Sequence, residues 1–195
     1  MGLLDVAKAP ILNDVATDLD DPPTYVRSRH GPIPESWKPR IRSAYPFLKP
    51  LLVTLSHGGG QQMAEVVAAV MDAATSLARN TPRWEVVAVQ THDEAASSSS
   101  SGAGGGVGGA VVGVLEAVST TRLMRFKDDL VMRLKLVEPQ AAWAGATGPG
   151  TTILRVDVRS ASRVGKGDLG TNAARIRDFL GRLREQLIQR DIHII

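Results

Sequence analysis

Two kinds of hydrophobic spacing follow one another from about residue 48 onward. Residues 48–55 (LKPLLVTL) form a short run rich in leucine and valine, which predicts a strand. In residues 61–79 the apolar side chains recur at every third or fourth position, which predicts an amphipathic helix. Because Pro82 cannot continue such a helix, we expect the helix to end near Asn80.

Beyond residue 83 the spacing is mostly that of strands. Runs rich in valine and leucine predict four strands, which cover residues 84–90, 111–126, 130–138 and 151–162. The polar triplet Lys127, Asp128 and Asp129 is expected to form the turn between the second and the third of them. In the last strand apolar residues alternate strictly with charged ones, which predicts one face in solvent. An apolar stripe that begins at about Thr171 predicts a closing helix.

This order of elements, strand, helix, four strands and helix, indicates an α+β fold. Consecutive strands joined by hairpin-like loops form an antiparallel sheet, and two amphipathic helices can bury their apolar sides against one face of it. The element order is similar to that of the TATA-binding-protein-like and helix-grip folds. The opposite face would be covered either by the N-terminal region or by a ligand, and its charged residues would be Arg133, Lys135, Arg155, Asp157 and Arg159.

We expect residues 1–47 to form a proline-rich arm that packs on the rest of the protein. Seven prolines disfavour long helices in this arm, and its aspartates precede its basic residues. Aspartates beside proline and threonine are typical turn formers. A second hypothesis is that they pair with arginines of the sheet. The remaining chain, 48–190, is expected to be a single domain with a low-complexity loop at 95–110 and a glycine-rich loop at 139–150.

Composition narrows the class of protein. The 195 residues are 43% hydrophobic and 22% charged, as in ordinary globular proteins, and the absence of cysteine excludes disulfides and thiolate metal sites. We expect no metal and no cofactor. No apolar run approaches the roughly 18 residues of a membrane span, so a soluble chain is expected. A net charge of only +3 and 4% aromatic residues disfavour a nucleic-acid partner.

A glycine-rich segment at 165–170 allows three interpretations. Its three glycines have the spacing of a dinucleotide-binding fingerprint, but no strand follows the last helix to complete a βαβ unit. A turn in which Asp168 or Thr171 caps the helix is the structural alternative. The third interpretation is that this turn binds a smaller anion with the help of Arg163 and Lys166.

Three segments, taken in order, resemble a known family. They are NDVATDLDDPP at 13–23, TTRLMRFKDD at 120–129 and RSASRVGKGDLGTNAARIRDFL at 159–180. They are similar to the bacterial and plastid-lineage family called domain of unknown function 1499, and the likeness spans about residues 11–184. The resemblance assigns no catalytic role to any residue. The compartment expected for such a chain is the cytoplasm or a plastid-type organelle.

We therefore expect a ligand-binding or protein-interaction module whose partner is a small anionic ligand or another protein. Its functional surface is predicted to contain Arg122, Asp128, Arg159, Ser162, Arg163, Asp168 and Asn172. The alternative is a cofactor-independent enzyme, such as an isomerase, cyclase or hydrolase, with Asp128 or His57 as its base. The four histidines show no metal-ligand spacing, which agrees with the expectation of no metal.

Overall fold

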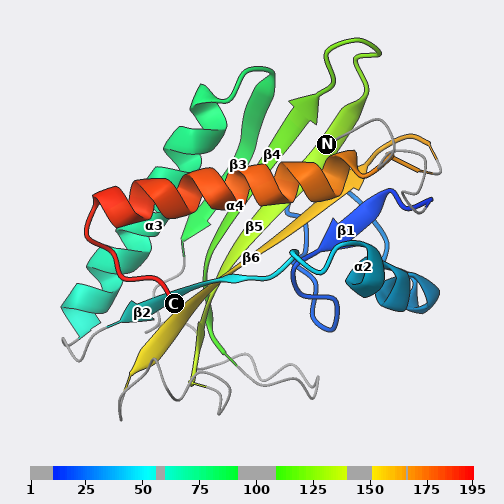
Figure 1. Ribbon diagram of the computed structural model, residues 1–195. Helices are drawn as coiled ribbons and strands as arrows, with labels where there is room; N and C mark the ends of the chain where they lie inside the picture. The colour runs from blue at the N-terminus through cyan, green and yellow to red at the C-terminus, as the bar shows by residue number, and fades with distance from the viewer. Residues whose placement is uncertain (1–10, 56–59, 92–108, 140–150, 166) are drawn as a thin grey trace.

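An antiparallel sheet forms the centre of the described part of the protein (Figure 1). The computed structural model describes residues 11–55, 60–91, 109–139, 151–165 and 167–195. Within these ranges the strands are β1 (Asp14–Ala16), β2 (Leu51–Leu55), β3 (Trp84–Thr91), β4 (Val111–Thr120), β5 (Lys127–Val137) and β6 (Thr152–Ser162). The strand order is β1-β6-β5-β4-β3. β2 also pairs with β6, along the same edge as β1 but with residues 152–156 instead of 159–161. The predicted antiparallel arrangement of the four consecutive strands is thus confirmed.

Two long helices cover one face of the sheet. They are α3 (Gly60–Asn80) and α4 (Thr171–Gln189), while the shorter η1 (Glu35–Trp37) and α2 (Lys38–Ala44) precede β2. The apolar residues of both long helices join alternate residues of the strands in one core, where Phe179 of α4 stacks on Trp84 of β3 at 5.8 Å between ring centroids. Burial of apolar area in this layer is the main stabilising contribution to the fold.

Two local predictions are wrong. Residues 127–129 do not form a turn, because β5 begins at Lys127 and the chain reverses at residues 121–126 instead. Asp128 and Asp129 can lie inside a strand because arginine side chains satisfy both carboxylates. The second error concerns the polar face of β6, where Asp157 is fully buried and Arg159 nearly so, although the alternation predicted exposure to solvent.

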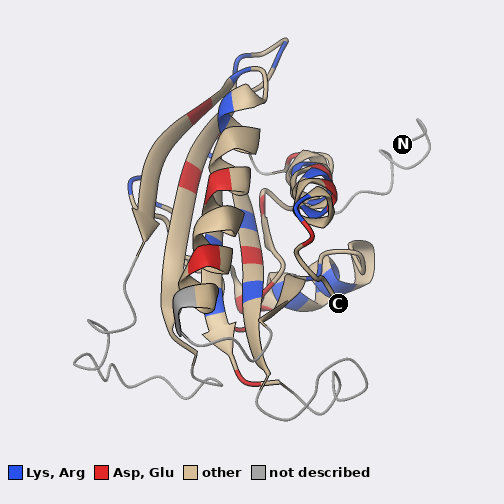
Figure 2. Cartoon of the chain, turned by 90° about the vertical axis from the view of Figure 1, so that its left-hand side faces the viewer, with Lys and Arg blue, Asp and Glu red and all other residues tan. Residues whose placement is uncertain are grey.

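That polar face is covered by the N-terminal region of the chain. β1 pairs with residues 159–161 of β6, and residues 17–31 then contact the sheet through hydrogen bonds and ion pairs. The periodicity did not predict β1, because three residues are too few to show an alternation. Figure 2 shows acidic and basic residues interspersed on the strands and helices of the folded protein.

Candidate functional site

Ion pairs attach the N-terminal region to the sheet at three successive positions of the arm. Asp14 contacts Arg159 at 2.6 Å, and Asp18 contacts Arg155 at 2.9 Å. Asp21 contacts Arg133 at 3.0 Å. The hypothesis that these aspartates pair with arginines of the sheet is therefore correct for these three residues.

A buried carboxylate of β4 fixes the loop that follows. Glu116 is fully buried and accepts three backbone N–H groups, from Val26 at 2.6 Å, Arg27 at 2.7 Å and Ser28 at 2.8 Å. Consecutive N–H groups that converge in this way form a concave anion-binding nest, and here Glu116 itself is the anion. Because charge-assisted hydrogen bonds are strong, the backbone of residues 26–28 is held in one place above the sheet.

A second buried carboxylate, Asp129 of β5, orients two side chains beside this loop. The Arg163 guanidinium donates to Oδ2 of Asp129 from Nε at 2.9 Å and to Oδ1 from Nη2 at 2.8 Å, and His30 Nε2 also lies 2.8 Å from Oδ2. Burial would raise the pKa of Asp129, but hydrogen bonds from His30, Arg163 and Ser28 outweigh burial and hold that pKa well below its ordinary value. Asp129 is therefore a charged anchor.

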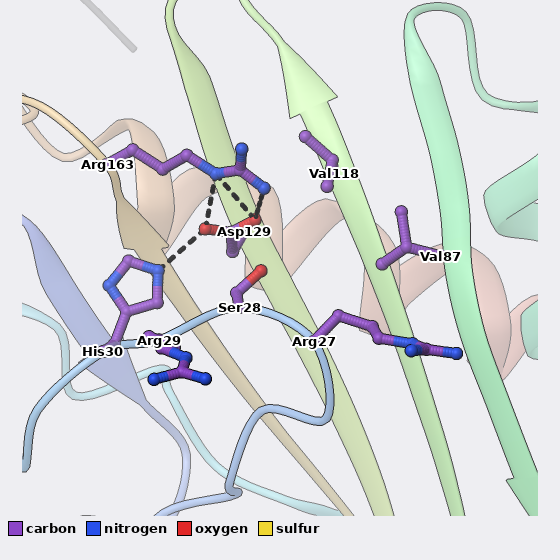
Figure 3. A pocket seen from close by; sticks show the side chains of 8 residues that line it. All are labelled: Arg27, Ser28, Arg29, His30, Val87, Val118, Asp129 and Arg163. Atoms are coloured by element: carbon purple, nitrogen blue, oxygen red, sulfur yellow. Dashed lines mark hydrogen bonds and ion pairs between the residues drawn. The ribbon is translucent and has the colours of Figure 1, made fainter.

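An open pocket of about 390 Å³ lies between this loop and the sheet (Figure 3). Arg163 and Asp129 stand on one side of it, and Val118 of β4 and Val87 of β3 form an apolar wall. Arg27 and Arg29 are exposed, and neither forms an ion pair with another described residue. The pocket is lined by Arg27, Ser28, Arg29, His30, Val87, Val118, Asp129 and Arg163.

A separate polar cluster lies on the helix side of the sheet. Arg175 of α4 donates to Asp128 at 2.5 Å and also to the side chain of Asn172. Asn172 is fully buried, accepts the Ser160 hydroxyl at 2.7 Å and donates to the Ser162 hydroxyl at 3.0 Å. Both side-chain polar groups of Asn172 are thus paired with residues of β6, and these hydrogen bonds join α4 to the sheet.

The predicted functional surface is therefore divided among five places. Asp128, Ser162 and Asn172 meet in the cluster on the helix side, where Asp128 is buried against Arg175 and is not placed to act as a base in an open cavity. The other four residues lie elsewhere: Arg159 against the arm, Arg163 in the pocket, Asp168 at the start of α4, and Arg122 in the exposed 121–126 loop. His57 lies outside the described residues.

The glycine-rich segment caps the last helix, which is one of its three interpretations. Asp168 accepts the N–H of Gly170 at 2.9 Å and that of Asn172 at 2.6 Å. Gly170 has a φ of 82°, a left-handed conformation that favours glycine. Every strand pairing in the described sheet is antiparallel, so these strands contain no βαβ unit for a dinucleotide.

Sequence reasoning missed most of the pocket. Ser28, Val87 and Val118 carried no sequence signal, nor did Glu116, which holds the loop, and Arg27, Arg29 and His30 were visible only as basic residues of the arm. The signal that could have found them is the string RSRH at 27–30, where three basic residues surround a serine in a segment otherwise rich in proline.

The fold and this pocket define a small α+β domain with a cationic recess on the polar side of its sheet. Residues 14–183 match the model of the family described as "Protein of unknown function (DUF1499)", so the chain belongs to that family, as its three motifs predicted. No curated protein and no solved structure matches the chain. None of the helices that the structure describes is both long and apolar enough to cross a membrane.

Proposed function

We propose that this domain binds a small anionic ligand in the pocket between residues 27–30 and the sheet. The observation that carries the proposal is the charge of the lining, which contains three arginines, Arg27, Arg29 and Arg163, but a single carboxylate, Asp129. Asp129 is already occupied by Arg163 and His30. Arg27 and Arg29, which lack ion-pair partners among the described residues, are therefore left for a bound anion.

The chemistry of the lining defines the class of ligand. Arginine binds carboxylate and phosphate groups through parallel N–H donors, which favours a ligand with one or two such groups. The wall formed by Val87 and Val118 favours an apolar portion on the same molecule. A volume of about 390 Å³ lies within the usual range for small-molecule sites. A phosphate or carboxylate attached to a small hydrocarbon group fits these requirements.

The pocket supports binding more than catalysis. A carboxylate whose pKa is held well below its ordinary value is a weak general base, and this describes Asp129. The similarity of the element order to TATA-binding-protein-like and helix-grip folds, and a cytoplasmic or plastid-type location, stay predictions, and the proposed ligand depends on neither.

Isothermal titration calorimetry with inorganic phosphate and with phenyl phosphate tests the proposal. Phenyl phosphate should bind more tightly, because its ring can contact the valine wall. The double variant R27Q/R29Q should weaken binding of both by about tenfold or more, since the loss of even one charged hydrogen bond costs about 1.5 kcal/mol. The matched control R79Q/R184Q removes the same charge from exposed arginines of α3 and α4 and should bind normally.

Two results would overturn the proposed function. One is the absence of measurable binding of either compound by the wild-type chain. The other is an equal loss of binding in R27Q/R29Q and in R79Q/R184Q, which would show that only the overall charge of the protein matters.

A further inference from the structure

The loop between β4 and β5 exposes large apolar side chains at one end of the molecule. Leu123 is 89% exposed, Met124 64% and Phe126 45%. Val164, which follows the end of β6, is 54% exposed, and the N–H of the preceding residue, Arg163, donates to the carbonyl of Lys127. Clustered exposed apolar residues of this size commonly mark a contact surface.

Hydrogen bonds hold this loop in a defined shape. The N–H of Thr121 donates to the carbonyl of Phe126 at 2.8 Å, and the N–H of Phe126 donates to the Thr121 hydroxyl at 2.8 Å. Arg125 takes a left-handed conformation with a φ of 52°, which lets the chain reverse within six residues. Leu123 and Met124 are thus presented at the tip of a closed hairpin that projects beyond the sheet (Figure 1).

The charges on the loop itself have one sign. Arg122, Arg125 and Lys127 are exposed, and the segment 119–127 contains no acidic residue. Figure 2 shows blue and no red on this loop at the top of the molecule. Arg83 adds a fourth exposed cation, because its carbonyl accepts the N–H of Thr120. Glu85 of β3 is the exposed acid close to this end.

We propose that this hairpin tip docks on membranes that contain anionic lipids. Leu123 and Met124 would enter the boundary between headgroups and acyl chains, while the arginines and Lys127 contact lipid phosphates. The tip is convex and small, whereas a stable protein interface buries roughly 800 Å² on each partner. A bilayer deforms around a projecting tip, so insertion of two or three side chains can act together with charge attraction.

Sedimentation with vesicles tests this proposal on the full chain. Binding to vesicles of phosphatidylcholine and phosphatidylserine at a ratio of about 7:3 should exceed binding to pure phosphatidylcholine. The variant R122Q/R125Q should reduce affinity for the anionic vesicles by about 30-fold, at about 1 kcal/mol for each arginine. L123S/M124S should reduce it by about tenfold or more. The control V89S/I188S replaces two exposed apolar residues elsewhere and should bind like the wild-type chain.

Three outcomes would overturn the proposal. They are equal binding to both kinds of vesicle, equal losses in L123S/M124S and V89S/I188S, and a concentration-dependent dimer that L123S/M124S abolishes. The last result would show that the tip contacts a second copy of the chain. None of the substituted tip residues lines the anion pocket, so binding of phenyl phosphate should be unchanged in L123S/M124S. Failure of the membrane proposal and failure of the proposed function are thereby distinguishable.

Discussion

Arg159 and Asp14 lie 145 positions apart in the chain, yet their side chains form a buried bidentate ion pair, with Nη2 to Oδ2 at 2.6 Å and Nε to Oδ1 at 2.9 Å. The same guanidinium donates to the Gly31 carbonyl at 2.6 Å and lies over the Tyr25 ring, 5.1 Å from its centroid. The Arg159 side chain of β6 therefore contacts the arm at two points: at Asp14 in β1, and at Gly31, directly after the loop that lines the pocket.

Replacement of Arg159 by methionine should strongly destabilise the protein. The substitution leaves Asp14 buried without its cation, and such a loss costs about 3–5 kcal/mol in the free energy of unfolding. Urea denaturation followed by circular dichroism measures this change. The double variant D14L/R159M removes both charges and should be more stable than R159M alone. A double variant as unstable as the sum of the two single ones would show that the pair is not coupled.

Asp129 should make the stability of the protein sensitive to acid. Its pKa in the folded protein is lowered, so its contribution is complete above the unfolded pKa of about 3.9 and is lost as the pH falls below that value. D129N should be less stable than the wild-type chain at pH 7, and the difference should shrink between about pH 4 and pH 2. Urea midpoints across this range measure it, and a constant difference would contradict the assignment.

Asp157 should show the opposite dependence. Burial raises the pKa of Asp157 in the folded protein, although Arg155 and Arg133 partly offset the effect. The folded state therefore holds its proton more tightly than the unfolded state, and stability decreases as the pH rises above about 3.9. D157N should gain stability relative to the wild-type chain as the pH rises from about 4 to 6. A relative loss over that interval would contradict the raised pKa.

The start of α4 should depend on two residues in different ways. D168A removes the acceptor of two backbone N–H groups and should cost about 1–2 kcal/mol, while D168N keeps an oxygen acceptor and should cost less. G170A places a Cβ at a φ of 82° and should cost about 1 kcal/mol. Thermal unfolding measures all three variants. Equal melting temperatures for D168A and the wild-type chain would show that the cap is not stabilising.

The regular elements could be predicted because their signal is local. The spacing of apolar residues predicted α3, α4 and strands β2 to β6, since each of these elements buries one side against a common core. The turn at 127–129 was mispredicted because polarity suggested a loop, whereas Arg163 and Arg175 allow Asp129 and Asp128 to be buried in β5. No local pattern records an ion pair with a residue distant in sequence.

The candidate site was harder to predict for the same reason. His30 and Asp129 are 99 positions apart, and they meet because Glu116 holds residues 26–28 over the sheet and Arg159 holds the Gly31 carbonyl. The glycine-rich segment has the spacing of a phosphate-binding loop, but two of its residues, Asp168 and Gly170, serve to begin a helix. Residues that line a pocket from separate elements leave no spacing rule to recognise.

Titration of the ¹⁵N-labelled protein with phenyl phosphate, followed by two-dimensional NMR, tests the central claim most directly. Binding in the proposed pocket should shift the backbone amide signals of Ser28, Arg29, His30 and Val118, together with the side-chain Nε–H of Arg163. R27Q/R29Q should require about ten times more phenyl phosphate to reach the same shifts, which corresponds to a loss of about 1.4 kcal/mol in binding free energy. Shifts confined to residues 165–170, or the same weak shifts over the whole surface, would contradict an anion site at residues 27–30.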